Sequence, residues 1–275
     1  MNTDMNTKTL SPEALAAIEQ YLHMKVGAAT ARVPYFNNKT ARTKLAVRVM
    51  VGKGTPREIA EEAQTVLVKN HVSPAALTGD ALAKLLADNG LGIDCSGLAY
   101  YILDAESRAR GTGHLNRHLS FVSRRGPVGK MRAYLRPAEN CDVKTFASDM
   151  NSRPIMMRDV RAGDLITMLG TSTHDATNGG MNGTTNGQRD HMLVIHRIDY
   201  ADGVPRALHY THSIAYPKDG LYGTGVRQGT IDLISIDGPL TEQVWSEEGS
   251  IEKARDIFAR AAASKMELRR LKWFE

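Results

Sequence analysis

The chain is poor in several residue types whose abundance marks particular protein classes. Only two cysteines occur in 275 residues, which excludes a scaffold held together by several disulfides. No apolar run approaches the ~18 residues that a membrane-spanning helix needs. The N-terminus has no basic segment followed by an apolar one, so no secretory signal is recognised. We therefore expect a cytoplasmic protein without a membrane anchor, with export by a non-standard route as the alternative.

An excess of charge of one sign is also missing. The chain carries 35 Lys and Arg against 30 Asp and Glu, a net charge of only +5. One basic cluster stands out, made of Arg124, Arg125, Lys130, Arg132 and Arg136 among Gly and Pro residues. A solvated loop explains this cluster better than a site for an anionic partner. The sequence predicts neither nucleic-acid nor membrane binding.

The remaining composition is that of a globular protein, because 42% of the residues are hydrophobic and 24% are charged. Capping signals followed by apolar residues at helical spacing predict four helices in the first 110 residues. Their expected starts are Ser11, Thr55, a point shortly before Leu82, and Cys95. A final helix is predicted over about Ile251 to Ala263. We expect residues 111–153 to form connecting loops with short elements of secondary structure.

Strands dominate the second half of the chain. Alternating or continuous apolar runs predict four of them, at 165–169, 192–198, 207–216 and 226–235. Asp202-Gly203 predicts a tight turn between the second and the third. Because helices come first and consecutive strands follow, we expect an α+β fold with an antiparallel sheet.

A polar, glycine-rich segment from Gly170 to Gln188 separates the first two predicted strands. Its composition gives it little with which to pack, so we expect a surface loop. It ends shortly before His191, at the mouth of the site described below. A lid over bound substrate and an idle insertion are equally compatible with this position.

Cys95 is the candidate nucleophile. It stands where helical periodicity begins, and unpaired N–H groups at a helix start favour the thiolate over the thiol. Gly97 keeps the first turn free of bulk, so a substrate carbonyl can approach the helix start. The alternative is a buried cysteine that only packs. Cys141 lies in no such context and is interpreted as a bystander thiol.

Two histidines complete the candidate site. His191 begins a strand that is apolar on both faces, so it is the expected general base. His212 shares a face with apolar neighbours on the following strand, which makes it the expected group that orients His191. His196 falls on the opposite face from His191, and His209 falls on the polar face of its strand. His196 is interpreted as a structural residue, and His209 fits the orienting function less well than His212.

Four short segments resemble the cysteine peptidases of the NlpC and P-sixty family, in order and in character. They are GIDCSGLAYYIL, RAGDLITM, DHMLVIHRI and HYTHSIAY. The resemblance implies a papain-like core, in which a helix that begins with the nucleophile packs on an antiparallel sheet. It assigns the nucleophile, the base and the orienting residue to Cys95, His191 and His212. Gly163-Asp164-Leu165 corresponds to the family's Gly-Asp-Leu start of a strand.

The same resemblance implies roles for three further residues. Tyr35, in the context Val33-Pro34-Tyr35, corresponds to the family's helper tyrosine, whose hydroxyl joins the oxyanion hole. Asp94 and Ser96 correspond to positions that help to bind the amino end of the substrate. It further implies one catalytic domain over 1–275, with a helical N-terminal extension at 1–90. The core is expected at 91–236 and a C-terminal helical segment at 237–275.

The expected function is therefore hydrolysis of an amide or peptide bond through an acyl-enzyme on Cys95. The expected partner is a peptide or amide substrate, with a cell-wall muropeptide as one candidate. An acyltransferase or amidase on the same scaffold, and a non-catalytic binding protein of this fold, are the alternatives. No cofactor or metal is expected, because neither His114 with His118 nor His209 with His212 has the partner set of a metal site. The sequence predicts no oligomeric state.

Overall fold

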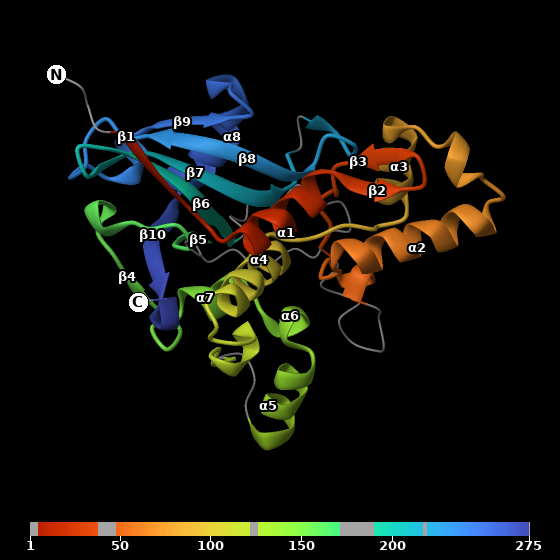
Figure 1. Ribbon diagram of the computed structural model, residues 1–275, viewed down its shortest axis with the longest axis horizontal. Coiled ribbons are helices and arrows are strands. Elements are labelled where there is room, and N and C mark those ends of the chain that lie inside the picture. Colours follow the sequence, from red (N-terminus) through yellow and green to blue (C-terminus); the bar gives the residue numbers. More distant parts are fainter. Residues whose placement is uncertain (1–4, 38–47, 122–125, 171–189, 217–218, 275) are drawn as a thin grey trace, which may run out of the picture.

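An eight-stranded antiparallel sheet lies at the centre of the computed structural model, which describes residues 5–37, 48–121, 126–170, 190–216 and 219–274 (Figure 1). Seven strands follow the order β4-β10-β5-β6-β7-β8-β9, and β1 pairs with β6. The strand bounds are β1 Met5–Thr9, β4 Ser152–Pro154, β5 Leu165–Gly170, β6 His191–Ala201, β7 Val204–Ile214, β8 Gly225–Asp232, β9 Val244–Glu247 and β10 Ser264–Leu271. A separate hairpin joins β2 Met24–Val26 to β3 Ala29–Ala31.

Eight α-helices surround the sheet among the described residues. Their bounds are α1 Pro12–Leu22, α2 Pro56–Lys69, α3 Gly79–Asp88, α4 Cys95–Ala109, α5 Gly126–Leu135, α6 Pro137–Asn140, α7 Val143–Ala147 and α8 Ile251–Ala262. Side chains of Ser11 and Thr55 cap the starts of α1 and α2, which confirms the two predicted caps, and Thr78 caps α3, where no cap was predicted. No helix in the described ranges combines the length and the apolar character needed to cross a membrane.

The predicted α+β class with an antiparallel sheet is confirmed. The four predicted strands are β5, β6, β7 and β8, which lie side by side in chain order. The β6–β7 hairpin turns at Asp202 and Gly203, with φ of 52° and 76°. Positive φ at both central residues is the geometry that an Asp-Gly turn favours between antiparallel strands. The turn predicted at this dipeptide is therefore confirmed.

The sheet separates two apolar cores. On one face, Met192 and Val194 of β6 pack with Leu98 and Ile102 of α4. On the other face, the alternate residues of β6 join the core that includes α8, with Leu193 and Ile195 beside Ile257 as examples. The centre of β6 is therefore buried on both sides, which explains its continuous apolar run. This double burial fixes the strand that begins at His191.

The structure divides the chain differently from the predicted extension, core and C-terminal helical segment. The sheet takes β1 from residues 5–9 and both β9 and β10 from residues 244–271. Strand β10 inserts between β4 and β5, far from its neighbours in sequence. The sequence SKMELRRL did not predict a strand. The reason is that buried charged residues occupy positions where a buried strand usually has apolar residues.

Arg270 of β10 is held by a buried ion pair with Asp164. Its Nε and Nη2 donate to the two carboxylate oxygens of Asp164 at 2.8 and 2.7 Å. The backbone N–H of Arg161 donates to the same carboxylate at 2.6 Å. Burial raises the pKa of Asp164, and the bonds from Arg270 and Arg161 oppose that rise. This ion pair gives the aspartate of the Gly-Asp-Leu motif a structural function, because it connects the start of β5 to β10, the C-terminal strand.

The first prediction concerns this ion pair. Arg270→Met should lower the free energy of unfolding by about 3–5 kcal/mol, because it leaves the buried Asp164 carboxylate without its partner. Adding Asp164→Asn should recover part of the loss, since the amide keeps an oxygen for the Arg161 N–H. Urea unfolding of the single and double variants measures both effects. A loss below about 1 kcal/mol for Arg270→Met contradicts the assigned role.

Candidate active site

Cys95 is the first residue of α4 and lies against the start of β6. Asp94 caps the helix, since its Oδ1 accepts the Gly97 N–H at 2.7 Å. The backbone N–H of Met192 hydrogen-bonds to the Cys95 thiol, so the sulfur lies beside the residue that follows His191. Only 8% of the Cys95 surface is exposed. The predicted nucleophile thus lies at the end of the strand that begins with the predicted base. Cys95 belongs to the core on the α4 face, whereas Met168, which pairs with His191, belongs to the core on the α8 face.

The surroundings of Cys95 keep its thiol protonated. Burial raises its pKa to about 12, and the charge of Asp94 contributes in the same direction. Lys53 and the Met192 N–H lower this pKa but do not overcome the burial. The expectation that the helix start favours a thiolate is therefore not met in this closed arrangement. The physical reason is that loss of hydration outweighs the N-terminal field of the helix.

Three buried side chains form a chain that begins at His191. His191 Nε2 lies 2.8 Å from His212 Nδ1, and His212 Nε2 lies 2.8 Å from Glu247 Oε1. The exposed fractions of His191, His212 and Glu247 are 2%, 1% and 0%. The strands β6, β7 and β9 supply one residue each. The structure thus brings the two predicted histidines together and adds a carboxylate.

The order of donors and acceptors follows from the carboxylate end. The Glu247 carboxylate 2.8 Å away favours a proton on His212 Nε2, although this contact does not meet hydrogen-bond geometry, and His212 Nδ1 is then left as an acceptor. His191 then donates from its Nε2 to His212 Nδ1. This assignment leaves Nδ1 of His191 without a proton, and therefore able to take one. The predicted orienting function of His212 has a direct geometric basis.

Sequence reasoning missed Glu247. The hydroxyls of Tyr210 and Tyr216 donate to its Oε1 at 3.2 and 3.0 Å, so the carboxylate is well supplied with donors. Burial raises its pKa, but His212 and the Tyr216 hydroxyl overcome that effect, and the net pKa is below the ordinary value. The available signal was an acid that shares a face with Trp245 on a short strand, where an apolar residue is usual.

His191 is neutral at physiological pH. Burial lowers its pKa well below the ordinary value, and His212 and Arg260 lower it further. A neutral imidazole is the form that accepts a proton from a thiol. Because Arg260 also lowers the pKa of Cys95, its guanidinium acts on both members of the pair.

A buried lysine, also missed from the sequence, organises the start of α4. Lys53 is 0% exposed, and its Nζ donates to Asp94 Oδ1 at 2.7 Å and to Ser96 Oγ at 2.6 Å. A third bond reaches the carbonyl of Cys141 at 3.0 Å. Asp94 and Ser96, predicted to bind substrate, are buried, and these contacts place them in the helix start. Their contact with substrate stays a prediction.

Tyr35 lies closer to the site than its position in the sequence indicates, since 95 − 35 = 60 residues separate it from Cys95. The Ile93 N–H donates to the carbonyl of Pro34 at 3.0 Å, and the Phe36 N–H donates to the carbonyl of Ile93 at 3.3 Å. The backbone of Tyr35 therefore lies beside that of Ile93, which is two residues before Cys95. Its hydroxyl accepts from Asn37 Nδ2 at 3.5 Å. The oxyanion role of Tyr35 stays a prediction.

The other histidines of β6 and β7 form a separate group. His196 Nδ1 lies 3.0 Å from Thr211 Oγ1, and His209 Nε2 lies 2.7 Å from Asp199 Oδ2. His196 was expected to be structural and His209 to fit the orienting function less well than His212, and neither belongs to the chain that begins at His191. Over the described ranges, no three His, Cys, Asp or Glu side chains are grouped so as to hold a metal ion.

No protein-family model matches the chain, and it has no significant match among curated proteins or among solved structures. The resemblance to the NlpC and P-sixty family is therefore a hypothesis that depends on the four short motifs and on the geometry of their residues. The predicted lid, at 170–188, falls outside the described residues except for Gly170. Its function stays a prediction.

Lys53 provides a test of the helix start. Lys53→Met should lower the free energy of unfolding by about 3–5 kcal/mol, because Asp94 remains buried without its cation. Asp94→Asn keeps a capping oxygen, so Lys53→Met combined with Asp94→Asn should lose less than Lys53→Met alone. Thermal and urea unfolding compare the variants. If the double variant is less stable than Lys53→Met, the ion pair is not the reason for the loss.

His191 predicts a specific dependence of stability on pH. Its pKa is lower in the folded state, so below pH ~6.5 the unfolded chain binds a proton that the folded chain does not. The contribution of neutral His191 is complete above that pH and is lost as the pH falls, by up to about 1.4 kcal/mol per pH unit. His191→Gln should flatten the dependence by this amount between pH 7 and 5. Urea unfolding at several pH values measures it, and equal slopes in both proteins contradict the prediction.

Proposed function

We propose that this protein is a cysteine hydrolase with a papain-like core of the NlpC and P-sixty type. It cleaves an amide or peptide bond, with Cys95 as nucleophile and His191 as base. The observation that carries the proposal is the buried chain from His191 through His212 to Glu247. A chain of this kind sets the tautomer and orientation of a base, and no packing requirement of the sheet calls for it. The implied substrate is a peptide, for example a cell-wall muropeptide.

The reaction begins with both groups neutral. As the Cys95 sulfur attacks the substrate carbonyl carbon, His191 Nδ1 takes the thiol proton, so attack and proton transfer occur together. The carbonyl electrons move to oxygen, where N–H groups at the start of α4 are suited to stabilise the charge. When the C–N bond breaks, the imidazolium returns the proton to the leaving amine, which leaves an acyl-enzyme thioester. Water then attacks the thioester with His191 again as base, which releases the acid and restores the thiol.

Glu247 stabilises the charged intermediate state of this cycle. When His191 carries a second proton, the positive charge is shared along the hydrogen bond to His212. The ionised Glu247 carboxylate lies on the other side of His212, 2.8 Å from His212 Nε2. The arrangement extends the familiar pair of histidine and carboxylate by one imidazole. Glu247 is thus proposed as a positioning residue that acts through His212.

Thiol alkylation tests the proposal without knowledge of the substrate. Iodoacetamide should label Cys95 at pH 7, and His191→Ala should slow that labelling by about tenfold or more, because the base that takes the thiol proton is gone. Cys141, which is 1% exposed, should be labelled far more slowly than Cys95. Mass spectrometry of the two cysteine peptides gives both rates. Equal labelling of Cys95 in both proteins contradicts the base role of His191.

The same variants decide activity on a panel of peptide amides and peptidoglycan fragments. Cys95→Ala should abolish turnover, and Glu247→Gln should lower kcat more than it changes KM. Glu248→Gln is the matched control, because this neighbouring carboxylate pairs with Arg32 and Lys253 and not with a histidine. Turnover that requires an amine acceptor and does not occur with water alone identifies an acyltransferase. An unchanged rate for Glu247→Gln contradicts its proposed role.

A further inference from the structure

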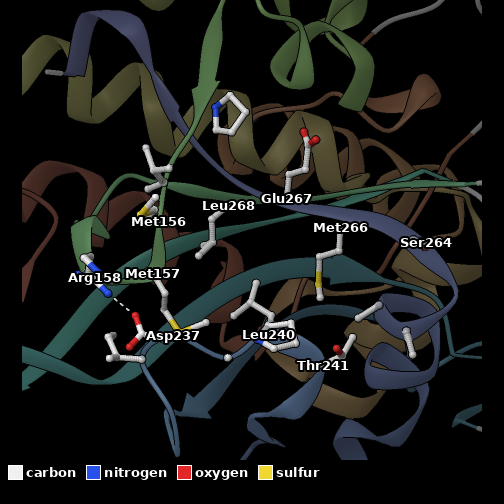
Figure 2. Close-up of a pocket in the computed structure, with 17 residues that line it drawn as sticks. Met156, Met157, Arg158, Asp237, Leu240, Thr241, Ser264, Met266, Glu267 and Leu268 are labelled. Carbon is white, nitrogen blue, oxygen red and sulfur yellow. Dashed lines mark hydrogen bonds and ion pairs between the residues drawn. The ribbon is translucent and has the colours of Figure 1, made fainter.

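A cavity of about 710 Å³ lies on the α8 face of the sheet, beside β10 (Figure 2). Met266 and Leu268 of β10 point into it, with Leu240 and Met157 on the facing walls. None of the residues of the Cys95 site lines it. An ion pair between Arg158 and Asp237 stands at one side, as the dashed line in Figure 2 shows. The walls are thus mainly apolar and the rim is charged.

The edge of β10 beside this cavity has no partner strand in the part of the chain that the structure describes. Strand β10 pairs with β5 over residues 264–269 but with β4 only over residues 269–271. The last bond on the β4 side runs from the Ile155 N–H to the carbonyl of Leu268 at 3.0 Å. The chain then enters a short helical turn at Met157–Asp159, of which Met157 and Arg158 still line the cavity.

The direction of the backbone groups follows from this last bond. Because the Leu268 carbonyl points toward Ile155, the backbone groups two and four residues earlier in β10 point the same way. Those are the N–H and C=O groups of Met266 and Ser264, both of which belong to partly exposed residues. The side chain of Met266 meanwhile enters the cavity. One short stretch therefore offers main-chain donors and acceptors next to an apolar cavity.

We propose that an extended peptide binds here as an added antiparallel strand. Its backbone continues the line of β4 along Ser264 and Met266, and its alternate side chains fill the cavity. A peptide strand is the occupant that matches both features, because it alone supplies alternating N–H and C=O groups together with side chains on one face. Antiparallel pairing follows from the direction of β4, whose line the peptide extends.

The residues that line the cavity indicate which peptide side chains would fit into it. Methionine, leucine and isoleucine residues dominate its walls, and such flexible surfaces accept aliphatic groups of varied shape. In an antiparallel pair, residues directly opposite each other lie on the same face, so the residues opposite Met266 and Ser264 direct their side chains to the cavity face. The ligand class is therefore a peptide with aliphatic residues at two alternate positions.

The site lies near the proposed active site but is distinct from it. Met266 pairs with Met168, and Met168 pairs with His191, so the three residues form a row across the sheet. Two strand spacings of ~4.8 Å separate the ends of that row by about 10 Å. Binding at this edge does not depend on the chemistry of Cys95. It is measured in the Cys95→Ala variant as well as in the natural chain.

The probe is the dye-labelled peptide acetyl-Thr-Leu-Thr-Leu-Thr amide, followed by fluorescence polarisation. Two derivatives carry N-methyl groups, one on both leucines and one on the second and third threonines. Leucines that face the cavity also direct their N–H groups to β10, so methylated leucines should weaken binding by about tenfold or more. Methylated threonines should leave it within about twofold, because those N–H groups point away from β10.

Two variants of the protein give the matched comparison. Ala262 lines the cavity, and Ala263 follows it without lining the cavity. Ala262→Trp should weaken binding of the peptide by about tenfold, whereas Ala263→Trp should leave it within about twofold. No binding of the unmodified peptide at about 1 mM, or equal binding of the two methylated peptides, overturns the proposal. Equal effects of the two tryptophan variants overturn the assignment of the side chains to the cavity.

Discussion

The ionised carboxylate of Glu247, a fully buried residue of strand β9, is the constraint on which the site depends. A buried charge of this kind is tolerated only where donors or cations surround it. Here two tyrosine hydroxyls donate to the carboxylate, and His212 Nε2 lies 2.8 Å from it. Satisfying the carboxylate fixes the tautomer of His212, and His212 in turn fixes that of His191. Three strands must keep their register for this to hold. The chemistry of the site and the order of the sheet are therefore parts of one arrangement.

A second buried charge performs a parallel task at the helix that carries Cys95. Lys53 saturates its three bonds with Asp94, Ser96 and a main-chain carbonyl, so the first turn of α4 is held from within. The backbone of Ile93 also pairs with the segment around Tyr35 on one side and with Lys53 on the other. The proposed nucleophile Cys95 thus begins a helix whose first residues have a backbone fixed on both sides, which keeps its sulfur at the start of β6.

Local sequence signals predicted what depends on local chemistry. The capped helices, the Asp-Gly turn and the four consecutive strands follow from periodicity and capping, and His191 and His212 could be paired because alternation along β7 fixes the face of His212. Glu247 and Lys53 could not be found in this way. Each is a charged residue in an unremarkable segment, and its function comes from partners 31 or more residues away in the chain, such as Tyr216 for Glu247 and Asp94 for Lys53. Strand β10 was not predicted for the same reason, because at Arg270 a buried ion pair with the distant Asp164 stands where an apolar residue would be expected.

The protonated state of Cys95 has a consequence for survival of the protein under oxidising conditions. Peroxides and similar oxidants react with the thiolate, and burial that raises the pKa of Cys95 to about 12 leaves almost none of it at neutral pH. In the proposed mechanism the sulfur loses its proton only as His191 takes it during attack, so little free thiolate would meet oxidants between turnovers. The same burial that slows the resting thiol therefore lengthens the working life of the site.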